Sequence, residues 1–109
     1  MLGGAAARVA DDATAYGWRD RPLLAWIIAD YGEADGDVLR RCTEWASGFR
    51  AALAEHGDGA FISFMADTGP DAVVQAYPPA TLERLRQVKR RYDPDNFFRA
   101  NHNIVPAEG

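Results

Sequence analysis

The sequence predicts an α+β fold, a small antiparallel sheet with two or three helices on one face. Two features of the 109 residues indicate it. Apolar residues run almost without interruption through the segments 23–29 and 61–65, as they do in strands that are buried on both faces. Between and after these segments they recur at every third or fourth position, which is the period of a helix with one buried side. A chain of this length fits a single compact domain.

The N-terminal part is expected to contribute the first strands. Residues 5–9 and 13–16 are short and weakly patterned strands, separated by a turn of two aspartates. The segment from Leu23 to Ala29 follows as a longer strand, because its tryptophan and isoleucines favour extended backbone. Since this segment is apolar throughout, we expect it in the centre of an antiparallel sheet that also contains Phe61–Met65.

Two helices are expected to cover one face of this sheet. The first runs from about Gly36 to Glu55, with an apolar stripe made of Val38, Cys42, Trp45, Phe49 and Leu53. The second begins near Pro79, because proline is favoured in the first turn of a helix. Its apolar stripe consists of Leu82, Leu85, Val88 and Tyr92. A strong turn signal at residues 93–96 ends it, and Phe97 and Phe98 then form a short apolar anchor before an extended tail.

Composition and charge argue against several classes of partner. The 12 basic and 16 acidic residues give a net charge of −4, whereas nucleic acid binding needs a basic face. Cys42 is the only cysteine, which excludes a disulfide framework and a cysteine-rich metal site. No apolar run approaches the roughly 20 residues that span a bilayer, and the first residues lack the pattern of a secretory signal. We therefore expect a cytoplasmic protein without a nucleic acid or membrane partner.

The C-terminal part of the sequence carries a long and specific signature. Residues 91–106 read RYDPDNFFRANHNIVP, which resembles the closing motif of the berberine-bridge-enzyme-like FAD-linked oxidases. Shorter matches keep the order and spacing of that family's last stretch, namely Gly3 to Ala5, Ala13 to Tyr16 with Arg19, Gly59 to Phe61, Ala76 with Tyr77, and Arg84 and Leu85 with Lys89. The resemblance covers nearly the whole chain.

This resemblance implies the C-terminal, substrate-side portion of an FAD-linked oxidase, without the domain that binds most of the flavin. In such an oxidase the flavin takes a hydride from the substrate, and oxygen regenerates it. The family's substrates are carbohydrates, alcohols and natural-product scaffolds. Gly3 and Gly4 do not form a phosphate-binding loop, because no strand precedes them and no GxGxxG motif follows. We therefore expect this chain alone to bind neither a flavin tightly nor a metal.

The resemblance also suggests residues for a substrate site. Phe61, Ser63 and Phe64 fall on the strand that faces the flavin in the family, where an asparagine and a tyrosine are frequent. Phe64 cannot exchange a proton and Ser63 is a shorter polar group, so no catalytic base is assigned. For both phenylalanines core packing is the alternative that we favour. Arg19 keeps the arginine of a Pro-His-Arg run, where it would pin a carboxylate or donate to a loop carbonyl.

Asn101 and Asn103 are the candidate cofactor-binding residues, since they lie where the family's tail passes the flavin. Their amides would bind the flavin ring or, equally, tie down the backbone of the tail. His56 and His102 are isolated in the sequence, so we expect satisfied or surface histidines and no metal ligand. A tyrosine needs a charged neighbour to act as acid or base at neutral pH, and none is evident for Tyr16, Tyr77 or Tyr92.

Two functions of different classes follow. The first is part of an FAD-linked oxidoreductase that works with a separate flavin domain, as the tail signature indicates. The second is a flavin-free protein in natural-product biosynthesis, either a binding module or a cofactorless cyclase or isomerase, as the missing base at Phe64 favours. In both cases the apolar second face of the sheet predicts a partner, either a second copy in a homodimer or a separate flavin-domain subunit.

Overall fold

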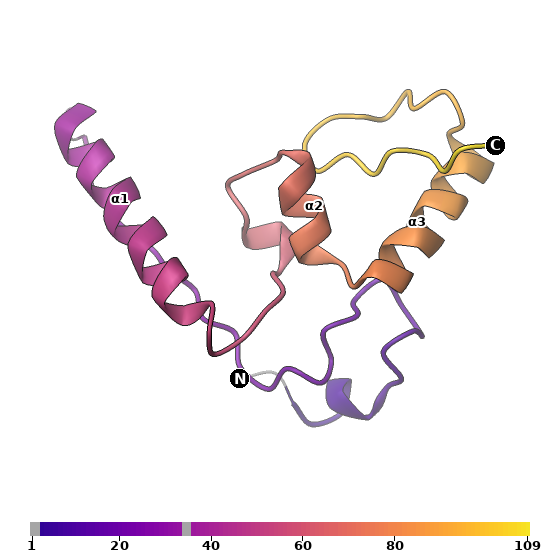
Figure 1. Cartoon of the computed structure of the whole chain (residues 1–109), viewed down its shortest axis with the longest axis horizontal. Helices are drawn as coiled ribbons and strands as arrows, with labels where there is room; N and C mark the ends of the chain where they lie inside the picture. Colours follow the sequence, from indigo (N-terminus) through magenta and orange to yellow (C-terminus); the bar gives the residue numbers. More distant parts are fainter. Residues whose placement is uncertain (1–2, 34–35) are drawn as a thin grey trace. The chain divides into compact units, whose positions relative to one another are not determined.

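A computed structural model describes residues 3–33 and 36–109. Its elements are the helices α1 (Gly36–Leu53), α2 (Pro70–Ala76) and α3 (Pro79–Tyr92), together with two 3-10 helices, η1 (Ala6–Arg8) and η2 (Ile62–Phe64) (Figure 1). The chain divides into two compact units. The first combines the described residues up to Leu24 with Gly59–Gly109, and the second is Ala25–Asp58.

The predicted antiparallel sheet is wrong, because the described residues contain no strand. Residues 23–29 have no regular secondary structure, and Trp26 in that segment is 62% exposed. An extended segment becomes a strand only when its backbone groups pair with a neighbouring strand. The segment 61–65, which was predicted to lie in the same sheet, does not offer a strand edge. Its amide N–H groups at Phe64 and Met65 donate instead to the carbonyl oxygens of Phe61 and Ile62 within a 3-10 turn.

The prediction of two N-terminal strands is also wrong, because these segments form hydrogen bonds within short turns. Residues 6–8 form η1, where the N–H of Arg8 donates to the carbonyl of Ala5 over 3.2 Å. Residues 13–16 follow a turn in which the N–H of Ala13 donates to the carbonyl of Ala10 over 3.1 Å. These short-range hydrogen bonds occupy the backbone groups that a sheet would need.

The predicted helices are confirmed, and a third one was missed. The helix predicted from Gly36 to Glu55 is α1, and the helix predicted to begin near Pro79 is α3. The missed helix is α2, which opens on Pro70 directly after the N-cap Gly69. Proline at the first helical position is a start signal, and Pro70 is such a signal.

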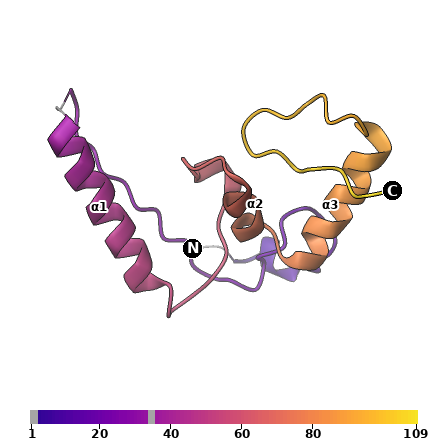
Figure 2. The same cartoon turned by 45° about the horizontal axis from the view of Figure 1, so that its top comes forward.

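The core of the first unit lies on α2. The buried apolar residues of the described chain are Ala72, Val73, Ala76 and Leu82, of which three belong to α2 and one to α3. The helix α2 packs against η2. The C-terminal tail runs back beside α3, where the N–H of Ala107 donates to the carbonyl of Arg86 over 3.1 Å (Figures 1 and 2). This backbone hydrogen bond therefore attaches the end of the tail to α3.

The second unit consists of α1 and the extended residues before it, which run alongside the helix in both views (Figures 1 and 2). On the solvent side Arg40 pairs with Asp37 and Glu44, at three and four positions' distance, as helix surfaces favour. Trp45 and Phe49 stack with their ring centroids 5.8 Å apart. No residue of α1 is fully buried. Within the part of the chain that the structure describes, no helix has the length and apolar character that crossing a bilayer requires.

Candidate functional site

Two segments that are distant in the sequence meet in a continuous row of rings in the first unit. The guanidinium carbon of Arg19 lies 5.3 Å from the centroid of the Tyr16 ring. Tyr16 makes an edge contact with Phe61 at 6.1 Å between centroids, and Phe61 lies 5.0 Å from Phe64 at a tilt of 57°. We call these four residues the aromatic row. Three of the predicted site residues, Arg19, Phe61 and Phe64, are thus brought together.

Arg19 is held by two hydrogen bonds from its guanidinium. Its Nη1 donates to the carbonyl of Ala6 over 3.1 Å, and its Nη2 donates to Oγ1 of Thr14 over 2.6 Å. Its Nε is buried and has no hydrogen-bond partner within the described residues. Two roles were considered for Arg19, binding a carboxylate and donating to a backbone carbonyl. The hydrogen bond to the carbonyl of Ala6 in η1 is of the second kind. Arg19 therefore positions the turn around Thr14 while its guanidinium stays against Tyr16.

Ser63 lies between two members of the turn that carries the row. It is the middle residue of η2, between Ile62 and Phe64, and it is exposed. Phe64 is 49% exposed, so that one end of the aromatic row is open to solvent. A hydroxyl and an accessible phenyl ring therefore stand side by side at the open end, without a group that exchanges protons at neutral pH.

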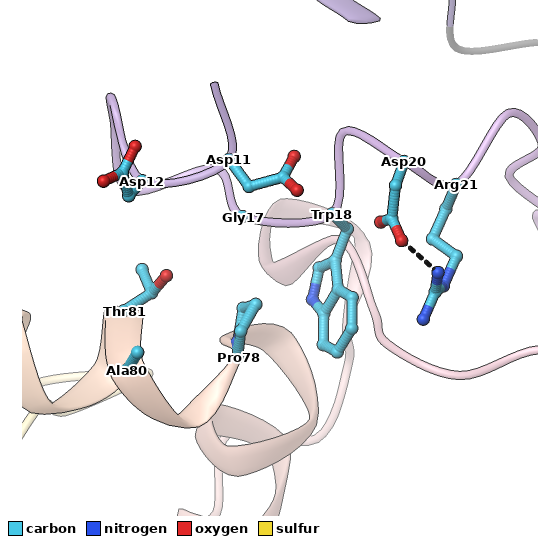
Figure 3. A pocket seen from close by; sticks show the side chains of 9 residues that line it. All are labelled: Asp11, Asp12, Gly17, Trp18, Asp20, Arg21, Pro78, Ala80 and Thr81. Carbon is cyan, nitrogen blue, oxygen red and sulfur yellow. Dashed lines mark hydrogen bonds and ion pairs between the residues drawn. The ribbon is translucent and has the colours of Figure 1, made fainter. Parts of the chain in front are cut away.

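Trp18 forms the second feature of the site (Figure 3). Its indole N–H donates to the carbonyl of Ala76 at the end of α2 over 2.7 Å. The guanidinium of Arg21 lies 5.6 Å from the indole ring. Gly59 has φ +85°, and a Cβ built on it would lie 2.7 Å from the indole atoms Cδ2 and Cε2. Trp18 is therefore half-buried, with its ring in close contact with Gly59, and its N–H ties the N-terminal segment to α2.

A shallow cavity of about 290 Å³ lies beside Trp18, between the N-terminal segment and the start of α3 (Figure 3). Three carboxylates line it, those of Asp11, Asp12 and Asp20. The one cation in its lining is Arg21, which is paired with Asp20. A diphosphate needs cations or clustered backbone N–H groups, so this acidic cavity does not fit the diphosphate of FAD.

The turn after α3 is organised by one carboxylate. Asp93 accepts hydrogen bonds from Nζ of Lys89 and from the N–H groups of Phe97 and Phe98, the latter two over 2.8 and 3.0 Å. Lys89 also donates to the carbonyl of Phe98. The hydrogen bond from Lys89, with the help of the two N–H groups, lowers the pKa of Asp93 against the opposing effect of burial. We call this set of hydrogen bonds the Asp93 knot.

The candidate cofactor residues lie in the tail that follows this knot. Asn101 adopts φ +56°, and its carbonyl accepts from the N–H of Asn103 over 2.9 Å. The Oδ1 atom of Asn103 is buried without a partner in the described part of the chain. His102 between them is 2.9 Å from the carbonyl of Asp67, which follows η2. The tail is thus tied beside η2, and its two amides are not brought into contact with the aromatic row by any described interaction.

The remaining candidates contribute little chemistry. Burial raises the pKa of Tyr77, so its phenol stays protonated at neutral pH and is a poor base. His56 is an exposed residue beside Glu55. Among the described residues, no three side chains of His, Cys, Asp or Glu lie together in a way that could hold a metal ion.

Two functional contacts were not anticipated from the sequence. The turn signal at residues 93–96 did not indicate the hydrogen bonds of the Asp93 knot, and no pattern in the sequence indicated the contacts of Trp18. Two glycines could have indicated the position of Trp18 from the sequence: Gly17, which precedes it, and Gly59, which lies against its ring. A Cβ on Gly17 would lie 2.7 Å from Cγ of Pro78, and Gly59 combines positive φ with the indole contact. Glycine is favoured where another group approaches the backbone this closely.

Comparisons with known proteins agree with these features. Residues 60–105, which include Phe61, Phe64 and the Asp93 knot, match the family described as berberine and berberine like. The FAD-linked oxidoreductase YgaK of Bacillus subtilis is 34% identical over 109 residues, covering 96% of this chain and 23% of that protein. The FAD-linked oxidoreductase fogF of Aspergillus ruber is 36% identical over 117 residues, covering 95% and 21%. Xylooligosaccharide oxidase of Thermothelomyces thermophilus is 31% identical over 117 residues, covering 99% and 23%.

Two of these relatives are named FAD-linked oxidoreductases, and that is the class of protein that this chain resembles. The chain belongs to the berberine-bridge-enzyme-like family of that class. It spans about a fifth of the length of the curated relatives it matches. FAD is therefore the cofactor of the family.

Proposed function

We propose that this chain is the substrate-side portion of an FAD-linked oxidoreductase that acts on a natural-product, alcohol or sugar-type substrate. The aromatic row carries the proposal. Residues 16–19 and 61–64 are separated by more than forty positions, yet Arg19, Tyr16, Phe61 and Phe64 form one connected surface. Flat apolar rings with one cation at the end suit a ring-shaped ligand that also carries polar groups.

In this proposal each member of the row has a part in binding. Phe64, at the open end, offers its ring to an apolar face of the ligand, and Ser63 offers a hydroxyl that donates or accepts. Tyr16 and Phe61 support that ring from behind through their edge and tilted contacts. Arg19 orients Tyr16 through the contact of its guanidinium with the ring. The row positions a ligand, and it contains no strong base.

Relatives' names support more than one of these substrate types, since one relative is named xylooligosaccharide oxidase and another (R)-6-hydroxynicotine oxidase; the sugar is the one chosen for the test. We propose that the FAD is held by the other part of such an oxidoreductase, which these residues do not supply. The acidic lining of the cavity beside Trp18 supports that division, because three carboxylates would repel a diphosphate. The flavin would accept a hydride from the ligand when it is bound there.

The test combines this chain with a partner that lacks the matching part. Xylooligosaccharide oxidase with its matching segment deleted is mixed with the 109-residue chain, FAD and a xylo-oligosaccharide, and oxygen consumption is followed. We expect oxidation that depends on the chain and falls about tenfold or more for Phe64→Ala, which removes the accessible ring. Phe49→Ala on α1 is the matched control and should leave the rate unchanged. Oxygen consumption that is absent, or equal for both variants, would contradict the proposal.

A simpler observation separates the flavin-free alternative. The purified chain should show no flavin absorption in the visible range by itself, and the mixture should show it. A chain that binds the oligosaccharide tightly without flavin, and that supports no oxidation in the mixture, would instead favour a stand-alone binding protein.

A further inference from the structure

One side of α1 presents two stacked aromatic rings to solvent. Trp45 and Phe49 are 55% and 47% exposed, although their rings lie 5.8 Å apart with only 12° between their planes. Val38 is exposed as well, and it precedes Trp45 by seven positions. Residues four and seven positions apart lie on the same side of a helix. We call Val38, Trp45 and Phe49 the α1 stripe, and large exposed apolar surface of this kind is typical of an interaction site.

A hollow beside the stripe has the form that accepts a side chain of a second helix. Its volume is about 380 Å³, and it is lined by four residues of α1, namely Val38, Arg41, Cys42 and Trp45. These residues are three, four and seven positions apart, counted from the first. Where two helices pack closely, each inserted side chain fits into a hole formed by four residues of the facing helix. The hollow is therefore suited to a helix rather than to an extended segment.

Two opposite charges flank the stripe at equal distances from a glycine. Arg41 comes seven positions before Gly48, and Glu55 comes seven positions after it. Seven residues make almost two helical turns, so the three lie along one edge of the helix. Glu55 is in the turn that continues α1, where the N–H of His56 donates to the carbonyl of Leu53 over 2.9 Å. Both charged side chains are exposed, and Arg41 forms no ion pair with another described residue.

We propose that α1 is the interface of a homodimer, in which two copies of the helix pack antiparallel with Gly48 at the two-fold axis. That axis brings Arg41 of each copy opposite Glu55 of the other, so the interface contains the same ion pair twice. A parallel pair would instead place like charges opposite each other, which is unfavourable. Gly48 has no side chain and nothing lies within 4 Å of its Cβ position, so the two backbones can approach closely there. The charges of this edge thus complement a second copy of the same edge.

The same axis covers the α1 stripe. Trp45 is three positions before Gly48 and Phe49 is one position after it, so in an antiparallel pair Trp45 of one copy lies within one helical turn of Phe49 of the other. The hollow faces the end of α1 in the second copy, where Ala52 and Leu53 supply small and apolar side chains. The second copy therefore removes the exposed rings from water and fills the hollow with apolar groups.

Charge reversal tests this arrangement, with the dimerisation constant of the 109-residue chain measured by sedimentation equilibrium. Arg41→Glu alone or Glu55→Arg alone replaces both ion pairs with like-charge contacts, and each is expected to weaken the dimer about tenfold. An equimolar mixture of these two variants restores opposite charges at both contacts. It should therefore form a mixed dimer whose affinity is within about threefold of the parent value. Arg50→Glu is the matched control, because Arg50 is nine positions from Arg41 and thus on the opposite side of the helix; it should change the affinity less than about twofold.

A further variant tests the stripe rather than the charges. Trp45→Ala removes one ring from each copy and is expected to weaken the dimer about thirtyfold or more, which is the scale of a hot spot. Circular dichroism of every variant checks that the helices are retained. A parent chain that stays a monomer at micromolar concentration would overturn the proposal. A dimer that is indifferent to both single charge reversals would overturn it as well, because the two helices would then not be antiparallel about Gly48.

The dimer does not depend on the proposed function. The α1 stripe belongs to the second unit and the aromatic row to the first, so Phe49→Ala should weaken the dimer and still leave the rate of oxidation in the mixture unchanged. If the chain pairs through α1 but oxidises no sugar together with the flavin-bearing part, which is xylooligosaccharide oxidase without its matching segment, the proposed function fails while the dimer stands. If the mixture oxidises sugar and charge reversal does not affect self-association, the dimer fails while the proposed function stands.

Discussion

Trp18 connects parts of the first unit that are far apart in the sequence. Its indole N–H reaches the carbonyl of Ala76, which lies 58 positions away, and its ring is close to the backbone of Gly59. A part-buried hydrogen bond of this kind contributes about 1 kcal/mol or less to the free energy of unfolding. Because the buried core of the described chain is small, each such contact accounts for a large share of the stability.

Gly59→Ala tests how closely the ring of Trp18 contacts Gly59. The new Cβ would lie 2.7 Å from two indole carbons, at a φ of +85° that side chains rarely adopt. We expect the free energy of unfolding to fall by about 2–3 kcal/mol, measured by urea denaturation. Gly57→Ala is the matched control, since nothing lies within 4 Å of its Cβ position, and it should change the stability by less than about 0.5 kcal/mol. Equal losses in both variants would contradict the close contact between Trp18 and Gly59.

Asp93 makes the stability of the first unit depend on pH. The hydrogen bond from Lys89 lowers the pKa of Asp93 in the folded chain, so the unfolded chain takes up its proton first as the pH falls. The stabilisation is complete above the unfolded pKa of about 3.9 and is lost as the pH falls through the folded value. We expect urea midpoints of the parent chain to fall more steeply in this acidic range than those of Asp93→Asn. Asp95→Asn, an exposed neighbour, should retain the steep fall; identical curves for the parent chain and Asp93→Asn would contradict the prediction.

The sequence predicted part of the candidate site, and the part that it missed depends on tertiary contacts. The resemblance named Arg19, Phe61 and Phe64, which the structure brings together around Tyr16. It did not show that Tyr16 is the link, because an edge contact across more than forty positions leaves no periodic pattern. Asn101 and Asn103 were chosen from the same resemblance, and their cofactor role stays a prediction.

At the scale of elements, helices were predictable and the sheet was not. The apolar spacing of α1 and α3 is a local property, so their bounds follow from sequence within a few residues. A strand depends on a neighbour that sequence alone does not identify. The segment 61–65 closes into the local hydrogen bonds of η2, so 23–29 has no described strand beside it. The helix α2 was missed because seven residues are too few to show a clear period.

The two adjacent valines of α2 allow a direct test of its packing. Val73 is 5% exposed and Val74 is 58% exposed, so the helix presents one to the core and the other to water. Val73→Ala removes two buried methyl groups and should lower the free energy of unfolding by about 1.5–2.5 kcal/mol. Val74→Ala should change it by less than about 0.5 kcal/mol. Equal unfolding midpoints in urea for the two variants would show that α2 is not packed as described.

At the scale of the whole molecule, many large apolar side chains remain in contact with water. They occur in both units, from Leu23, Trp26 and Ile28 to Trp45, Phe97 and Phe98. An uncovered sheet face does not call for a partner, because the described residues form no sheet. The exposed apolar side chains are themselves the reason to expect a partner, because large exposed apolar surface is typical of interaction sites.

We therefore predict that the isolated chain associates with itself in solution. Light scattering at micromolar concentration should give a mass above the 12.0 kDa of one chain, and addition of the flavin-bearing part should shift the chain into a mixed complex. A mass of one chain without aggregation would contradict this prediction.

The Asp93 knot also has a consequence for the order of events in folding. Its partners are four, five and nine positions apart, so closing it requires only a short loop, and such loops close in about 10–100 ns. The contact between Trp18 and Ala76 must bring together residues 58 positions apart, which costs more entropy and takes longer. The C-terminal signature is therefore expected to acquire its native turn while the rest of the first unit is still an open chain. In stopped-flow refolding, amide protection at Phe97 and Phe98 should precede protection in α2, and the reverse order would show that the tail waits for the core.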